Sequence, residues 1–178
     1  YRVPKNTEVL VWHLGAEPDT LNQLLSTDVY SSRINGFLFD TLLERNNETL
    51  AFQPKLAERW ELSADKKVFT FYLREGLRWH DGQPVTVEDI VYSFERIMDP
   101  KVNAPHLRVY YQEIERVEKV APRVVRFIMK RPYFMALNFC SGISIMPKHL
   151  YEGKDFNKHE LNRAPVGNGP YRFVRWDT

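Results

Sequence analysis

The stretch from Phe69 to Ile97 changes its hydrophobic period halfway along, and this change restricts the fold more than any other feature of the sequence. Phe69, Phe71 and Leu73 alternate with more polar residues, which is the period of a half-buried strand. Residues 80–82, "HDG", then favour a turn, because Asp and Gly adopt turn conformations at low cost. The last third has the period of an amphipathic helix. Its apolar face consists of Val87, Ile90, Val91, Phe94, Ile97 and Met98.

The polar residues of this stretch have either a structural or a catalytic interpretation. Thr86 stands at the expected N-cap with Asp89 three positions later, which resembles a capping box. Glu88 and Asp89 also favour the positive end of the helix dipole. A paired-carboxylate mechanism that uses these acids with His80 and Asp81 is conceivable. Turn and cap roles explain all four residues, so we interpret the stretch as a fold signature and not as an active site.

Elsewhere the chain is mostly β with a few helices. Residues 8–14, "EVLVWHL", predict a buried strand, and residues 171–176, "YRFVRW", predict the last strand. Between them, the apolar positions of residues 30–43 predict a helix. Residues 63–67 and 121–123 are expected to connect two β-hairpins. We expect the middle of the chain to have its own core, which contains Trp60, Phe69, Phe71, Leu73, Ile90 and Phe94.

Composition and motifs exclude several classes of function. The net charge of +2 is small and the basic residues are dispersed, so nucleic-acid binding is not expected. No apolar run approaches the roughly 20 residues that cross a bilayer. The five histidines lack zinc-site spacing, and phosphate-binding, dinucleotide-binding and GxSxG motifs are missing from the sequence. We therefore predict neither an enzyme nor a metal or cofactor site. The single cysteine, Cys140, lies in an apolar run and is predicted to be buried and unreactive.

Four segments together resemble the family 5 extracellular solute-binding proteins, the receptors of ABC importers for oligopeptides, dipeptides and nickel. The longest is "LAERWELSADKKVFTFYLREGLRWHDGQPVTVEDIVYSF" at 56–94. The others are "EPDTLN" near the start, "IMPKHLY" late in the chain, and "PVGNGPYRF" near the end. The departures are Gln23 where proline is common, Val87 where alanine is usual, and Asn168 where threonine is usual.

The resemblance implies a mixed α/β fold of the type II periplasmic-binding-protein architecture, in which two lobes close over a ligand. On this pattern residues 1–45 begin the first lobe, 46–164 form an inserted domain, and 165–178 return to the first lobe. Gly167 and Gly169 would let the chain return tightly. Family members are much longer, so we expect this chain to correspond to their N-terminal part, with any secretory signal already removed.

The implied function is that of a receptor that captures peptides between its lobes and delivers them to an ABC transporter permease. The location is then periplasmic or extracytoplasmic, and the protein is expected to be a monomer. Thr27, Asp28 and Val29 align with the ligand-binding strand of the first lobe, although a plain surface turn fits them equally well. Two alternatives stay open: a family member for another ligand, such as a nickel chelate, an opine or a sugar oligomer, and a stand-alone protein-interaction module.

Overall fold

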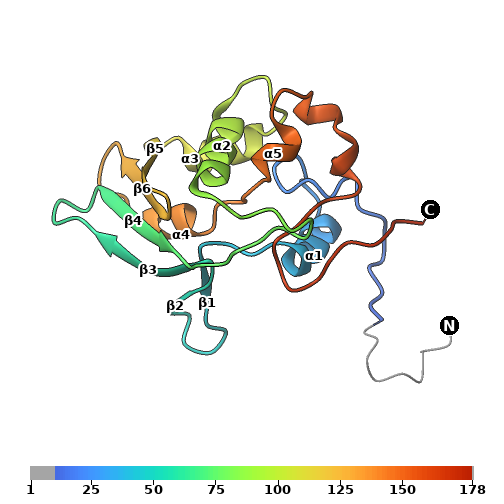
Figure 1. The fold of residues 1–178 in the computed structure, drawn as a ribbon, viewed down its shortest axis with the longest axis horizontal. Helices are drawn as coiled ribbons and strands as arrows, with labels where there is room; N and C mark the ends of the chain where they lie inside the picture. Colours follow the sequence, from blue (N-terminus) through green and yellow to red (C-terminus); the bar gives the residue numbers. More distant parts are fainter. Residues whose placement is uncertain (1–10, 178) are drawn as a thin grey trace.

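A four-stranded antiparallel sheet, seen on the left in Figure 1, is the largest sheet of the computed structural model, which describes residues 11–177. The strands are β3 (Ala57–Leu62), β4 (Val68–Leu73), β5 (Ile114–Ala121) and β6 (Val124–Met129), in the order β3-β4-β6-β5. Both predicted hairpins are confirmed, since β3 pairs with β4 and β5 with β6. Lys66 provides the positive φ that the first hairpin turn needs.

Helix α2 (Val87–Met98) covers one face of this sheet. The predicted capping box is present: the backbone N–H of Asp89 donates to the side chain of Thr86, and the Asp89 carboxylate accepts from the backbone N–H of Thr86 at 2.8 Å. The alternating positions of β4 and β6 face the helix and are buried. The rings of Phe71 and Phe127 meet edge to face there, 5.5 Å apart. The strand–turn–helix interpretation of 69–97 is therefore correct.

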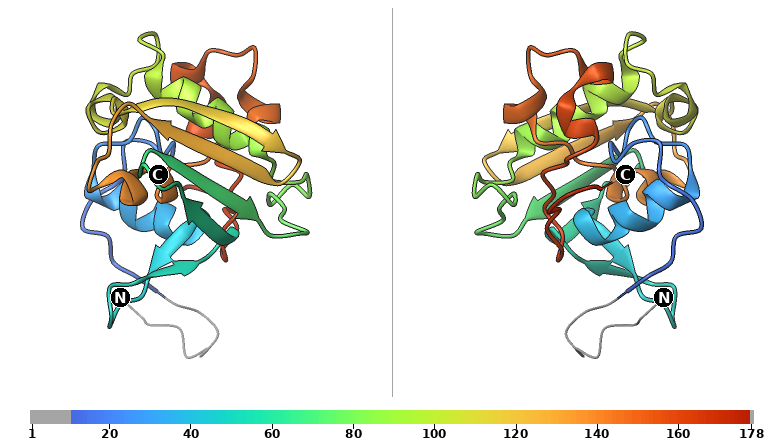
Figure 2. Two further views of the ribbon diagram at one scale, coloured as in Figure 1. Left: turned by 90° about the vertical axis from the view of Figure 1, so that its left-hand side faces the viewer. Right: turned by 90° about the vertical axis from the view of Figure 1, so that its right-hand side faces the viewer.

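Shorter elements surround this unit (Figure 2). The helices and strands that complete the order are α1 (Val29–Leu38), β1 (Leu43–Arg45), β2 (Phe52–Pro54), α3 (Pro105–Tyr111), α4 (Ala136–Ser141), α5 (Lys148–Tyr151) and the 3-10 turns η1 (Phe156–Lys158) and η2 (Glu160–Asn162). Within residues 11–177, no helix combines the length and the apolar character needed to span a membrane.

The helix predicted at 30–43 is shorter than expected. It ends at Leu38, because Phe39 adopts an extended conformation and the chain then leads into β1. Leu42 is fully buried, but it contributes to the core from this extended connection and not from a helical face. Periodicity alone does not locate the end of a helix where the next segment continues to bury apolar residues.

The two strands predicted at the chain ends are wrong for the described residues. Residues 11–14 and 171–176 are irregular, and residues 8–10 lie outside the described part. A strand needs a neighbouring strand with which it forms a ladder of hydrogen bonds, and neither segment has one among residues 11–177. The two segments nevertheless lie close together, because the ring of Phe37 contacts Trp12 at 5.7 Å and Tyr171 at 5.4 Å.

One continuous hydrophobic core connects the described parts of the chain. Five of the six predicted core residues are buried, and Trp60 packs against them with partial exposure. Leu24, Leu38 and Leu42 belong to the same cluster, so the expectation of a separate core within 46–164 is wrong. Cys140 is fully buried, as predicted, and burial raises the pKa of its thiol.

Candidate functional site

Residues Thr27 to Val29 form the start of helix α1. Asp28 is the N-cap residue: its backbone is extended, and its carboxylate accepts a hydrogen bond from the backbone N–H of Ser31 at 2.7 Å and another from the Ser31 hydroxyl. Val29 is the first helical residue, and both Thr27 and Val29 are exposed. The ligand-binding strand expected here is therefore not a strand, because Asp28 starts a helix instead. A contact between this segment and a ligand stays a prediction.

The carboxylate of Asp28 is committed to its own helix. Partial burial raises its pKa, but the hydrogen bonds from the side chain and backbone of Ser31 outweigh this effect and hold the pKa below its ordinary value. The group is consequently ionised at neutral pH and satisfies the free backbone N–H groups at the positive end of α1. The neighbouring residues Thr27 and Val29 are exposed on either side of it.

The other end of α1 is held by the glycine-rich segment 167–169. The backbone N–H groups of Asn168 and Gly169 donate to the carbonyl of Leu38 at 3.1 and 2.8 Å, and the Asn168 side chain accepts from Asp40 N–H at 2.9 Å. A Cβ atom on Gly167 would overlap the Leu38 carbonyl oxygen, and one on Gly169 would come within 2.7 Å of the carbonyl carbon. Both positions require glycine because of this close backbone approach.

The "HDG" turn completes this junction. His80 donates its backbone N–H to Gly167 O, and its Nε2 lies 2.8 Å from Gly169 O. The neighbouring Asp81 pairs with Nε2 of His149 at 2.7 Å. The central, late and final segments of the signature therefore contact one another directly. The sequence assigned His80 and Asp81 to a turn correctly, but no local pattern indicated their partners.

The acidic residues of α2 are also engaged in structural contacts. Asp89 accepts hydrogen bonds from the backbone N–H of Lys148 at 2.8 Å and from the indole N–H of Trp79 at 3.3 Å, besides its capping bonds. Glu88 forms an ion pair with Lys119. The turn and cap roles predicted for these residues are thus present, and additional partners hold the helix against the "IMPKHLY" segment.

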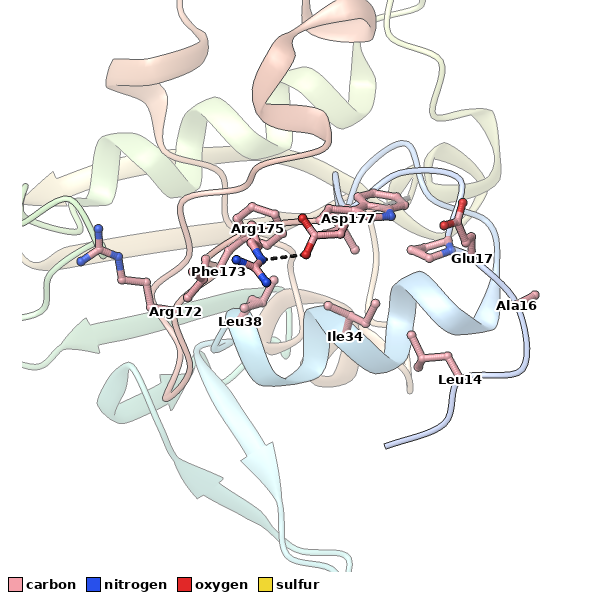
Figure 3. A pocket seen from close by; sticks show the side chains of 13 residues that line it. Leu14, Ala16, Glu17, Ile34, Leu38, Arg172, Phe173, Arg175 and Asp177 are labelled. Atoms are coloured by element: carbon pink, nitrogen blue, oxygen red, sulfur yellow. Dashed lines mark ion pairs between the residues drawn. The ribbon is translucent and has the colours of Figure 1, made fainter. Parts of the chain in front are cut away.

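An open groove separates α1 from the last described segment (Figure 3). It has a volume of about 540 Å³ and a largely apolar floor, to which Ile34, Leu38 and Phe173 contribute. Arg175 and Asp177 form an ion pair of 2.7 Å at its edge. Leu14 lines the same groove, so the first and the last described segments both border it.

The comparison with protein families decides the classification of this scaffold. Residues 51–178 match the family described as bacterial extracellular solute-binding proteins, family 5, middle region. The chain belongs to this family. The resemblance predicted from the four segments is therefore confirmed, and so is the mixed α/β fold class, since family 5 binding proteins are its structural neighbours.

Three relatives of this family 5 chain illustrate the likeness. The probable peptide-binding protein YejA of Agrobacterium fabrum is 35% identical over 88% of this chain and 26% of its own length. NikZ of Campylobacter jejuni, solved with Ni(L-His), has a TM-score of 0.80 and 31% identity over 91% of this chain and 32% of its own. AppA of Bacillus subtilis, solved with a nonapeptide, has a TM-score of 0.79 and 28% identity over 90% and 32%. This chain spans about a third or less of each relative.

Proposed function

We propose that this family 5 chain is part of a substrate-binding receptor of an ABC importer, which captures peptides between two lobes and delivers them to a membrane permease. The supporting observation is the likeness to AppA, whose structure holds a nonapeptide, across 90% of this chain. A hinge-closing receptor binds its ligand through contacts that form only in the closed state. It works outside the cytoplasm as a monomer, without catalysis and without nucleic acid.

The domain division follows the same proposal. Residues 1–45 and 165–178 belong to the first lobe, and residues 46–164 form the inserted domain that braces it. The contacts of 167–169 with the C-terminal end of α1 support the return at this point, because they join the final segment to the first one. The hydrophobic core that both parts share supports a common scaffold around α1.

A nickel chelate is the second candidate ligand. The likeness to NikZ, solved with Ni(L-His), is as close as the likeness to AppA. The bound ligand distinguishes the two candidates. A longer polypeptide that contains this chain is purified without denaturant, and the ligand that it releases is identified by mass spectrometry. A mixture of short peptides is expected. Release of nickel with a small chelator would favour the second candidate. If the protein shows saturable binding of neither peptides nor nickel chelates, the receptor proposal is contradicted.

A further inference from the structure

A second pocket lies beside Thr27–Val29, on a different face of α1 from the groove in Figure 3. It has a volume of about 270 Å³, several times the roughly 30 Å³ of a water molecule. No charged residue lines it among those the structure describes. Its walls carry six uncharged polar side chains: Gln23, Ser26, Ser32, Asn35, Thr41 and Ser144. We call it the polar pocket.

Two polar atoms of the polar pocket are buried without a partner. Asn35 is only 7% exposed, and its side-chain oxygen Oδ1 has no hydrogen-bond partner among residues 11–177. The hydroxyl oxygen of Ser26 is likewise buried and has no hydrogen-bond partner among these residues. Buried polar atoms in native proteins are nearly always paired, because an unpaired one costs free energy. Two such atoms belong to residues of one pocket, and no residue among 11–177 pairs with either of them.

Gly36 is a second feature that packing does not explain. It lies within α1, where glycine is less favourable than alanine, and it has no positive φ. A Cβ atom added there would meet nothing within 4 Å, in contrast to Gly167 and Gly169. The bare backbone of Gly36 lines the polar pocket, so the missing side chain keeps the pocket open.

We propose that the polar pocket is a ligand subsite that receives an uncharged amide group of a bound peptide; this inference rests on the receptor function proposed above. An amide supplies one N–H donor and one carbonyl acceptor, and these match the hydroxyl and side-chain amide groups that line the pocket. A charged group would lose its hydration without meeting an opposite charge. Unfavourable local features that converge on one pocket are typical of a functional site.

The test uses the ¹⁵N-labelled 178-residue chain and N-acetylglycinamide as a neutral amide probe. Saturable chemical-shift changes are expected at the side-chain amide of Asn35 and the backbone amides of Ser26, Gly36 and Ser144. Acetate and methylammonium, the charged controls, are expected to leave these signals at least tenfold less affected. Absence of any saturable change with the neutral probe would mean that the pocket holds only water, and would overturn the inference.

Gly36→Leu fills the pocket and serves as the blocking variant. It is expected to abolish the probe-dependent shifts, while signals of the central sheet stay in place and report the intact fold. Arg33→Leu is the matched control, because it puts the same side chain at a neighbouring exposed position of α1 outside the pocket. Equal probe binding by wild type and Gly36→Leu would contradict the inference.

Asn35→Leu supplies an independent measurement. If Asn35 serves a ligand, removal of its unpaired oxygen leaves the melting temperature unchanged or raises it, and abolishes the probe shifts. A drop of several degrees relative to Asn47→Leu, an exposed control, would show a structural role and overturn the inference. Failure of this test is separable from failure of the receptor proposal, because the receptor proposal is tested by the ligands of a longer polypeptide that contains this chain.

Discussion

The central sheet with α2 and the two chain ends around α1 are built in different ways. In the sheet, every strand forms hydrogen bonds with a neighbouring strand from residues 57–129. The two strands of each pair are connected by a short turn or by one crossover. At the ends, residues 11–14 and 171–177 contact α1 through aromatic rings and form no strand. The difference teaches that apolar alternation becomes a strand only where the same chain offers a partner.

The largest expected loss of stability comes from a substitution in the core of the sheet, which does not touch the segments at the chain ends. Phe71 is fully buried, so Phe71→Ala is expected to lower the free energy of unfolding by about 3–5 kcal/mol. Phe37 is only partly buried between the two chain ends, and Phe37→Ala should cost less than half as much. Urea unfolding of both variants measures the contrast. Equal losses would show that the ends are as integral to the fold as the sheet.

The next largest loss of stability is expected from a substitution that disturbs the contact between segment 167–169 and α1. Gly167→Ala forces a Cβ atom into the Leu38 carbonyl, and overpacking of this kind costs about 1–3 kcal/mol. Gly76→Ala is the control, since Gly76 has a φ of +71° but open space around its Cβ position, which leaves a strain of about 1 kcal/mol. If Gly167→Ala proves no more harmful than Gly76→Ala, the glycine junction does not depend on close backbone approach.

The sequence predicted the sheet unit well because its information is local. The hairpins at 63–67 and 121–123, the alternation of Phe69 to Leu73 and the cap at Thr86 each act within a few residues. The contacts of the candidate site are long-range. No periodicity reveals that His80 meets Gly169, or that the side-chain oxygen of Asn35 has no hydrogen-bond partner among residues 11–177.

The errors at the ends have the same physical origin. The alternating residues of 171–176 satisfy the strand pattern, yet their neighbours in space are α1 and a groove and not another strand. At Thr27–Val29, the resemblance implied a strand, whereas Asp28 lies just before the helix predicted at 30–43, and Asp is a preferred N-cap residue. That signal was present in the sequence and outweighs the alignment for local structure.

A smaller effect concerns the cap at Asp28 and its pH dependence. Asp28→Ala removes the cap of α1 and is expected to cost about 1 kcal/mol near neutral pH. Because the folded-state pKa of Asp28 lies below the ordinary value of 3.8, this contribution is complete above that value. It disappears as the pH falls through the lower folded-state pKa. Urea unfolding of both proteins between pH 2 and 7 should therefore converge in acid, and a constant difference would contradict the cap assignment.

The smallest expected change in stability belongs to a substitution that tests whether Thr27–Val29 binds a ligand. Val29→Pro places proline at the first helical position, where its missing N–H is not needed, and Asp28 already has the extended backbone that proline requires before it. Stability should change by less than about 0.5 kcal/mol. If the Val29 N–H donates to a ligand, peptide affinity of the longer receptor should fall by about 1–3 kcal/mol.

Val29→Ala is the matched control for this proline, since it shortens the same side chain and retains the backbone N–H. Its effect on peptide affinity should be small. Unchanged affinity in Val29→Pro, combined with unchanged stability, would make Thr27–Val29 a surface segment without a role in binding.

Isothermal calorimetry with a peptide identified from the longer receptor tests the two-lobe proposal most directly. If residues 11–177 provide a stable scaffold and one wall of the binding site, ligand burial requires the second lobe. The 178-residue chain is therefore predicted to give no saturable heat at peptide concentrations that saturate a longer polypeptide of its relatives' length. Saturable binding of the same affinity by the 178-residue chain alone would contradict the two-lobe receptor.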